Sequence, residues 1–187
     1  IIDVRNNGGG FVSQLLIQKI MRKIWAFFKA RNAPFSDSVP ERAFHGHVAV
    51  VTNQSAGSDG DIFTKSFQLL KLGPVFGMRT WGGVVGIRAN KRFVDGGLMT
   101  QPEFAWWAPS LKWSLENSGA TPDYVIDNTP NDLERGKDPQ LNAAVSWLLS
   151  KLAKDPKALP KLPAYPDKSI EAFRKKWKNW KKPPAKR

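Results

Sequence analysis

Residues 48–63, VAVVTNQSAGSDGDIF, join a short apolar run to an amphipathic helix. Small and polar residues fill the junction, and Ser58 stands where the helix is expected to begin. A serine at such a position is exposed and lies beside a helix N-terminus, which suits a nucleophile and stabilises an anion. An ordinary helix N-cap, with Asp61 three residues further on, explains the same pattern.

A strand, a helix and a second strand can be identified around this stretch. Residues 1–4 are an apolar strand candidate, apolar residues recurring every four positions predict a helix over residues 11–30, and residues 47–52 are the second strand. This spacing predicts parallel strands joined by a right-handed crossover. The loops at residues 7–10 and 54–61 should therefore face each other at one edge of the sheet, where open α/β folds place ligands.

The elements after Ser58 complete an α/β pattern. They are, in chain order, a helix over residues 59–72, strands over 75–79 and 84–87, a hairpin over 93–100, a strand over 124–126 and a helix that begins at Asp138-Pro139. Such an order predicts βαβ units with a mainly parallel sheet flanked by helices.

Length and composition limit the class of protein. A chain of 187 residues suits one domain of ordinary size. The lack of cysteine excludes disulfides, a thiol nucleophile and cysteine-ligated zinc, and no apolar run is long enough to cross a bilayer. Because the chain opens on a core strand without an initiator methionine, we expect it to be a piece of a longer polypeptide.

The positive charge is concentrated at the C-terminal end. Residues 151–187 hold 13 Lys/Arg and 3 Asp/Glu, a net charge of +10, which leaves +3 of the total of +13 for residues 1–150. Recurring prolines predict a domain over residues 1–155 and an extended basic tail over 156–187, with a short helix at 169–180. This tail could bind nucleic acid, but a solvated tail is the preferred interpretation and nucleic-acid binding is not expected.

Two groups of residues are candidates for catalysis. Ser58 could act as a nucleophile, with backbone amides of Asp59 and of the glycines at residues 8–10 stabilising an oxyanion; a capped helix and a turn are the alternative. Glu116 could orient a catalytic histidine; a surface or salt-bridged glutamate is the alternative.

Metal and cofactor sites are not predicted. His45 and His47 flank a glycine at the strand entrance, far from Ser58, without an obvious third ligand, and are interpreted as surface residues. The Asp59-Gly60-Asp61 triplet lacks the rest of a calcium loop. The glycine loop matches neither the dinucleotide fingerprint nor the P-loop.

Several motifs resemble those of tricorn-type proteases, within the wider family of C-terminal processing serine peptidases. They are IDVRNNGGG at residues 2–10, TNQSAGSDGD at 52–61, RTWGGVVGI at 79–87, LEN at 115–117, TPD at 121–123 and RGKDPQL at 135–141. The resemblance covers most of residues 1–153 and excludes the tail.

The resemblance implies a Clp/crotonase-like α/β fold and a set of site residues. It implies Ser58 as nucleophile, Asp59 as one oxyanion-hole amide, and Gly9 or Gly10 as the other. Glu116 matches the acid that holds the catalytic histidine.

The general base is not accounted for by the motifs. One branch of the family places a lysine where this chain has Gly83. The tricorn branch uses a histidine, preceded by a serine, from a segment before a PDZ-type domain, and neither His45 nor His47 matches it. We therefore expect the base to come from an upstream part of the same polypeptide, and the isolated chain to be inactive.

These inferences predict a serine endopeptidase that cleaves peptides through an acyl-enzyme on Ser58. By resemblance we expect it to form a homo-oligomer. No cofactor is expected, and the compartment is left open between the cytoplasm and, in bacteria, the periplasm or the exterior of the cell. A catalytically inactive peptide-binding or scaffolding relative of the same fold is the alternative.

Overall fold

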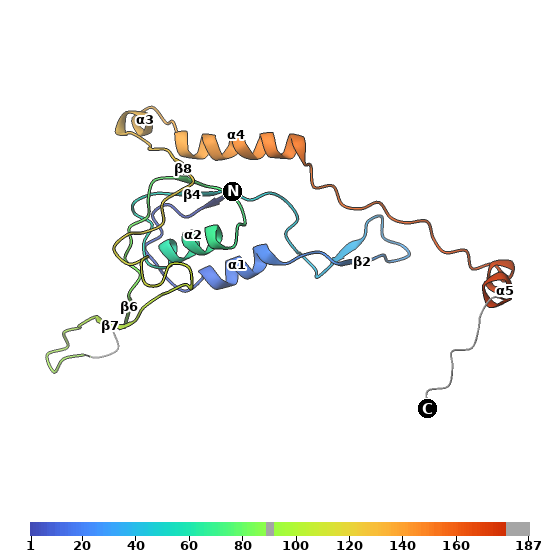
Figure 1. Ribbon diagram of the computed structural model, residues 1–187, viewed down its shortest axis with the longest axis horizontal. Helices are drawn as coiled ribbons and strands as arrows, with labels where there is room; N and C mark the ends of the chain where they lie inside the picture. Colours follow the sequence, from blue (N-terminus) through green and yellow to red (C-terminus); the bar gives the residue numbers. More distant parts are fainter. Residues whose placement is uncertain (89–91, 179–187) are drawn as a thin grey trace. The chain divides into compact units, whose positions relative to one another are not determined.

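A computed structural model describes residues 1–88 and 92–178 (Figure 1). The chain forms two compact units, Ile1–Lys157 and Ala158–Arg187. The first unit contains the sheet and the candidate site, and the second contains one described helix, α5.

The central sheet of the first unit is parallel. Its order is β1-β4-β5-β8, formed by Ile2–Asp3, Val50–Thr52, Val75–Gly77 and Tyr124–Val125. Each neighbouring pair is parallel, and Val50 lies opposite both Ile2 and Val75. The α/β prediction and the parallel pairing of the first two strands are confirmed.

Both faces of the sheet are covered by helices, because apolar residues alternate between the faces. Val50 packs with residues of α1 (Ser13–Met21) and α2 (Asp59–Leu69). Val51, one position on, packs with α4 (Pro139–Lys154) on the opposite face. Figure 1 shows α4 on one side of the strands and the other two helices on the other side.

Local signals explain where two of the helices begin. Asp138 accepts a hydrogen bond from the Leu141 N–H at 2.9 Å and Pro139 occupies the first position, so α4 begins as predicted. The short helix α3 (Pro130–Glu134) was not predicted, although Thr129 and Asp132 form a capping box at its start.

The predicted helix over residues 11–30 is wrong beyond Met21. Arg22 is extended, and Ala26–Phe28 forms β2, which pairs antiparallel with Asp37–Val39, β3. Aromatic side chains suit a strand as well as a helix, so the apolar repeat did not distinguish the two. The partner strand, which sequence periodicity does not reveal, decides the structure here.

A second hairpin borders the site. Gly86–Arg88, β6, pairs antiparallel with Gln101–Phe104, β7. Between them the Phe93 N–H donates to the Gly97 carbonyl at 2.9 Å, which confirms the predicted turn around Asp95-Gly96-Gly97.

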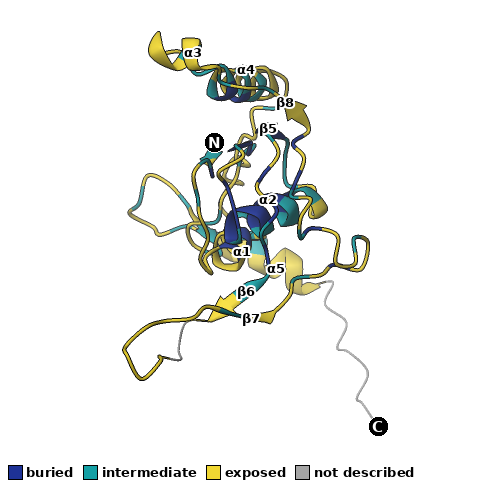
Figure 2. Cartoon of the chain, turned by 90° about the vertical axis from the view of Figure 1, so that its left-hand side faces the viewer, coloured by how far each residue is buried: buried dark blue, intermediate teal, exposed yellow. Residues whose placement is uncertain are grey.

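The second unit contains helix α5, Ile170–Lys178, close to the predicted bounds; Trp180 lies outside the described residues. Figure 2 shows α2 as buried and α5 as exposed. No helix in the described part of the chain is long and apolar enough to cross a membrane.

An ionic network ties the edge strand to α4. Arg5 lies 2.7 Å from the Asp3 carboxylate and 2.8 Å from that of Asp138. Burial opposes ionisation of Asp138, but hydrogen bonds from Leu141, Asn128 and Arg5 outweigh it and lower the pKa of Asp138. The network therefore stabilises the ionised form.

We expect Asp138→Asn to lower the free energy of unfolding by roughly 1–2 kcal/mol at about pH 7. Because the pKa of Asp138 is lower in the folded than in the unfolded protein, its stabilisation is present above about pH 4 and is lost as the pH falls through the folded pKa. Urea unfolding from about pH 7 to about pH 3 should show the difference from wild type shrinking. Asp37→Asn, at an exposed position, controls for the loss of one charge; an equal effect of both variants would contradict the prediction.

Candidate active site

Ser58 occupies a strained backbone conformation at the start of α2. Its φ is 53° and its ψ is −112°, values that non-glycine residues rarely adopt. The Ser58 carbonyl accepts the Ile62 N–H at 3.0 Å, so the residue opens the helix. Its side chain makes no capping hydrogen bond. Ser58 is therefore the N-cap residue of α2 by position, but the expected capping interaction with Asp61 is absent, and the hydroxyl is not used to hold the helix.

The glycine loop lies directly against Ser58, as the topology predicted. A Cβ atom placed on Gly9, whose φ is +130°, would lie 2.8 Å from Ser58 Cβ and 3.1 Å from its Oγ. Asn7 joins the two loops, since its carbonyl accepts the Gly57 N–H at 2.8 Å. Its side-chain oxygen accepts the Gly9 N–H at 3.0 Å. The close approach requires glycine at position 9.

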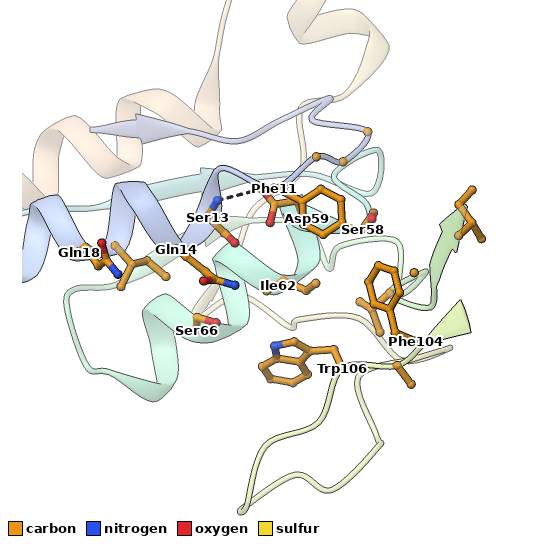
Figure 3. A pocket seen from close by; sticks show the side chains of 18 of the residues that line it. Phe11, Ser13, Gln14, Gln18, Ser58, Asp59, Ile62, Ser66, Phe104 and Trp106 are labelled. Carbon is orange, nitrogen blue, oxygen red and sulfur yellow. Dashed lines mark hydrogen bonds between the residues drawn. The ribbon is translucent and has the colours of Figure 1, made fainter. Parts of the chain in front are cut away.

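The Asp59 carboxylate caps a helix other than its own. Its Oδ2 accepts hydrogen bonds from the N–H groups of Val12 at 2.9 Å and Ser13 at 3.0 Å, at the start of α1. Figure 3 shows the bond from Ser13. Asp59 is only 3% exposed. These two hydrogen bonds fix the end of the glycine loop relative to Asp59, the residue that follows Ser58.

The second carboxylate of the triplet, Asp61, holds a different loop. Its Oδ1 accepts the Gly82 N–H at 2.8 Å, and the residue is fully buried. Asp59 and Asp61 thus bind separate backbone segments. Within residues 1–88 and 92–178, no cluster of three or more His, Cys, Asp or Glu residues could hold a metal ion.

Glu116 holds a turn by hydrogen bonds to its backbone. Its Oε2 accepts the N–H groups of Val84 at 2.6 Å and Val85 at 2.9 Å. The next residue, Asn117, donates its N–H to the Gly82 carbonyl at 2.6 Å. Glu116 is therefore a half-buried acceptor of two amides, and not the surface or salt-bridged glutamate of the alternative interpretation.

The turn that Glu116 holds also contacts the serine loop. The Trp81 N–H donates to the Ala56 carbonyl at 2.8 Å. The indole ring lies against Gly57, where an added Cβ would come within 2.6 Å of Trp81 Cε3. Ser58 and Glu116 are thus connected through the Trp81 turn.

A cavity of about 630 Å³ opens beside Ser58. Figure 3 shows side chains from α1, α2 and the segment with Phe104 and Trp106 pointing toward one another across it. Among the described residues that line it, Asp59 alone is charged, and its carboxylate is bonded to α1. The apolar side chains that line it are Phe11, Ile17, Ile62, Leu70, Val84, Ile87, Phe104, Ala105 and Trp106.

The two histidines lie away from this cavity, at the entrance to β4. His47 is half-buried, and its Nε2 lies 2.8 Å from the Asp155 carbonyl oxygen and 3.4 Å from the Asp155 carboxylate. The surface interpretation is thus corrected for His47, whereas His45 is exposed. His47 connects the entrance of the strand to the end of α4.

Sequence reasoning missed three features of the site: the Asn7 bridge, the contact of Trp81 with the serine loop, and the cap that the Asp59 side chain provides. All three depend on loops that are distant in sequence, so no local pattern predicts them. The RTWGGVVGI motif marked the Trp81 turn without indicating its contact.

A strained serine at a helix start, set against a glycine loop at the carboxyl edge of a parallel sheet, is the arrangement of a serine-type hydrolase. Residues 1–126 match the model of peptidase family S41. The chain belongs to that family, whose members are serine-type peptidases.

Known relatives confirm the tricorn-type resemblance. Tricorn protease of Thermoplasma acidophilum is 46% identical over 164 residues, 88% of this chain and 15% of the relative. Tricorn protease homolog 1 of Streptomyces coelicolor is 43% identical over 164 residues, 87% of this chain and 15% of the relative. A crystal structure of the tricorn protease matches with a TM-score of 0.77 and 46% identity over 81% of this chain and 15% of that one. The chain thus spans a small part of these relatives.

We expect Gly9→Ala to lower the free energy of unfolding by about 1–3 kcal/mol, because the new methyl group meets Ser58 and φ is unfavourable for alanine. Gly8→Ala is the matched control, since an added Cβ there meets nothing within 4 Å. Urea unfolding of the two variants measures the difference. Equal free energies of unfolding for Gly9→Ala and Gly8→Ala would show that Gly9 does not lie in close contact with Ser58 in solution.

Proposed function

We propose that this chain is the nucleophile-bearing part of a serine endopeptidase that hydrolyses peptides through an acyl-enzyme on Ser58. The observation that carries the proposal is the Ser58 backbone, held at a φ of 53° beside Gly9 with its hydroxyl not used as a helix cap. Such strain is retained where the surrounding contacts enforce it, which is common at catalytic residues.

In the proposed reaction, Ser58 Oγ attacks the peptide carbonyl carbon while a base accepts the hydroxyl proton. The carbonyl oxygen becomes an oxyanion, the amine leaves with the proton returned by the base, and water then hydrolyses the ester. We assign the oxyanion donors to the N–H groups of Asp59 and Gly10. The Gly9 N–H already donates to Asn7, which favours Gly10 over Gly9.

The base in this proposal is a histidine from outside residues 1–187, oriented with the help of Glu116. The two histidines of this chain do not support that role, because His47 contacts Asp155 and both precede β4, whereas Ser58 follows it. Glu116 uses Oε2 to hold the Trp81 turn next to the serine loop. The greater length of the tricorn relatives is consistent with a base from another part of the polypeptide or from another subunit of a homo-oligomer.

A peptide-binding relative without catalysis is the second candidate. The cavity beside Ser58 favours it, since an apolar lining holds peptide side chains whether or not a base is present. The two candidates differ in whether Ser58 reacts.

We expect a fluorophosphonate probe to modify Ser58 in the full-length protein, as located by peptide mapping. Ser58→Ala should abolish labelling and reduce peptidase activity at least about 10³-fold. Ser55→Ala, an exposed serine of the same loop, is the control and should retain both.

Activity that survives in Ser58→Ala would overturn the assignment. Peptide binding by a full-length wild-type protein that the probe does not label would favour the second candidate.

We expect Glu116→Gln to reduce kcat by about 10²–10⁴-fold, as for other acids that orient a catalytic histidine. The glutamine oxygen can still accept the Val84 and Val85 amides, so the melting temperature should change little. Steady-state kinetics and thermal unfolding of the full-length protein test this, with the exposed Glu134→Gln as control. An unchanged kcat would remove Glu116 from the catalytic group.

A further inference from the structure

Helix α5 of the second unit carries an exposed apolar stripe. Ile170, Phe173 and Trp177 follow one another at three- and four-residue spacing, which places them on one face. Their exposed fractions are 64%, 61% and 50%, and the rings of Phe173 and Trp177 lie 5.7 Å apart between centroids. An apolar face of this kind normally marks a surface that binds something.

The rest of the helix is strongly basic. It contains one acidic residue, Glu171, and four basic residues, Arg174, Lys175, Lys176 and Lys178. In helical projection, Arg174 and Lys176 border the apolar stripe on its two sides. Their long aliphatic stems allow the charged ends to reach phosphates above an apolar boundary.

The charge of the chain indicates what kind of surface fits. Residues 158–187 hold ten Lys/Arg and two Asp/Glu, a net charge of +8, and the other +5 of the total lies in residues 1–157. Residues 1–157, in this chain or in a second copy of it, are thus net positive and do not attract the basic helix α5 by their overall charge. The fitting partner is anionic and also has an apolar layer.

We propose that α5 binds an anionic lipid surface, lying in its plane with Ile170, Phe173 and Trp177 in the acyl boundary and the basic residues at the headgroup phosphates. A nine-residue helix lies in such an interface and does not span it. A nucleic acid would pair with the charges but would leave Ile170 and Phe173 without an apolar partner. A lipid surface offers an apolar layer to the apolar stripe and phosphates to the basic residues.

Cosedimentation of the full-length protein with vesicles tests the proposal. We expect binding to vesicles of equal parts phosphatidylcholine and phosphatidylglycerol, weakened by salt, and little binding to phosphatidylcholine alone. Phe173→Ser, which leaves the charge unchanged, should weaken binding by about tenfold or more. Tyr165→Ser, an exposed aromatic residue of the same unit outside the helix, is the matched control and should bind like wild type.

Two results would overturn the proposal. One is equal vesicle binding by Phe173→Ser and wild type together with displacement from the vesicles by a single-stranded oligonucleotide, which would indicate binding by charge alone. The other is no binding to the mixed vesicles at low salt. The Ser58→Ala variant should bind vesicles like wild type, so the result does not depend on the peptidase proposal.

Discussion

The carboxylate of Asp59 is the contact on which the geometry of the site depends. It is almost fully buried and accepts the first amides of α1, so its negative charge meets the positive end of that helix. The glycine loop leads directly into α1, and Ser58 directly precedes Asp59 in the chain. One side chain therefore sets the separation of two loops whose backbone amides would act together on an oxyanion.

Carboxylates also accept backbone amides in the other loops of the site, which contain little regular secondary structure. Buried acceptors take the amides that a helix or sheet would otherwise satisfy. Asp61 accepts from Gly82, and Glu116 accepts from Val84 and Val85. The acidic residues Asp59, Asp61 and Glu116 thus all accept backbone N–H groups, and these hydrogen bonds join the loops of the site to one another.

Much of the fold could be predicted because its strands are apolar on both faces and its crossovers obey a fixed topology, which also placed the glycine loop opposite Ser58. Two errors have physical causes. The helix beyond Met21 gives way to β2 because pairing with β3 competes with helical periodicity. The pattern of Ser58 and Asp61 is the same for a capped helix and for an exposed serine. The structure distinguishes them because the Ser58 side chain makes no capping hydrogen bond, while Asp61 accepts the Gly82 N–H from a loop distant in sequence. The role of the Asp59 side chain is tertiary and has no local signal.

Trp81 lies against two glycines at once, so the residues at positions 57, 81 and 83 constrain one another. A Cβ at Gly57 would come within 2.6 Å of the indole and one at Gly83 within 2.5 Å. A side chain at either position would displace the ring, and a smaller residue at 81 would uncover both glycines, because Trp81 is 64% exposed. The three positions are therefore coupled sterically, so a substitution at one of them is expected to need a compensating change at another.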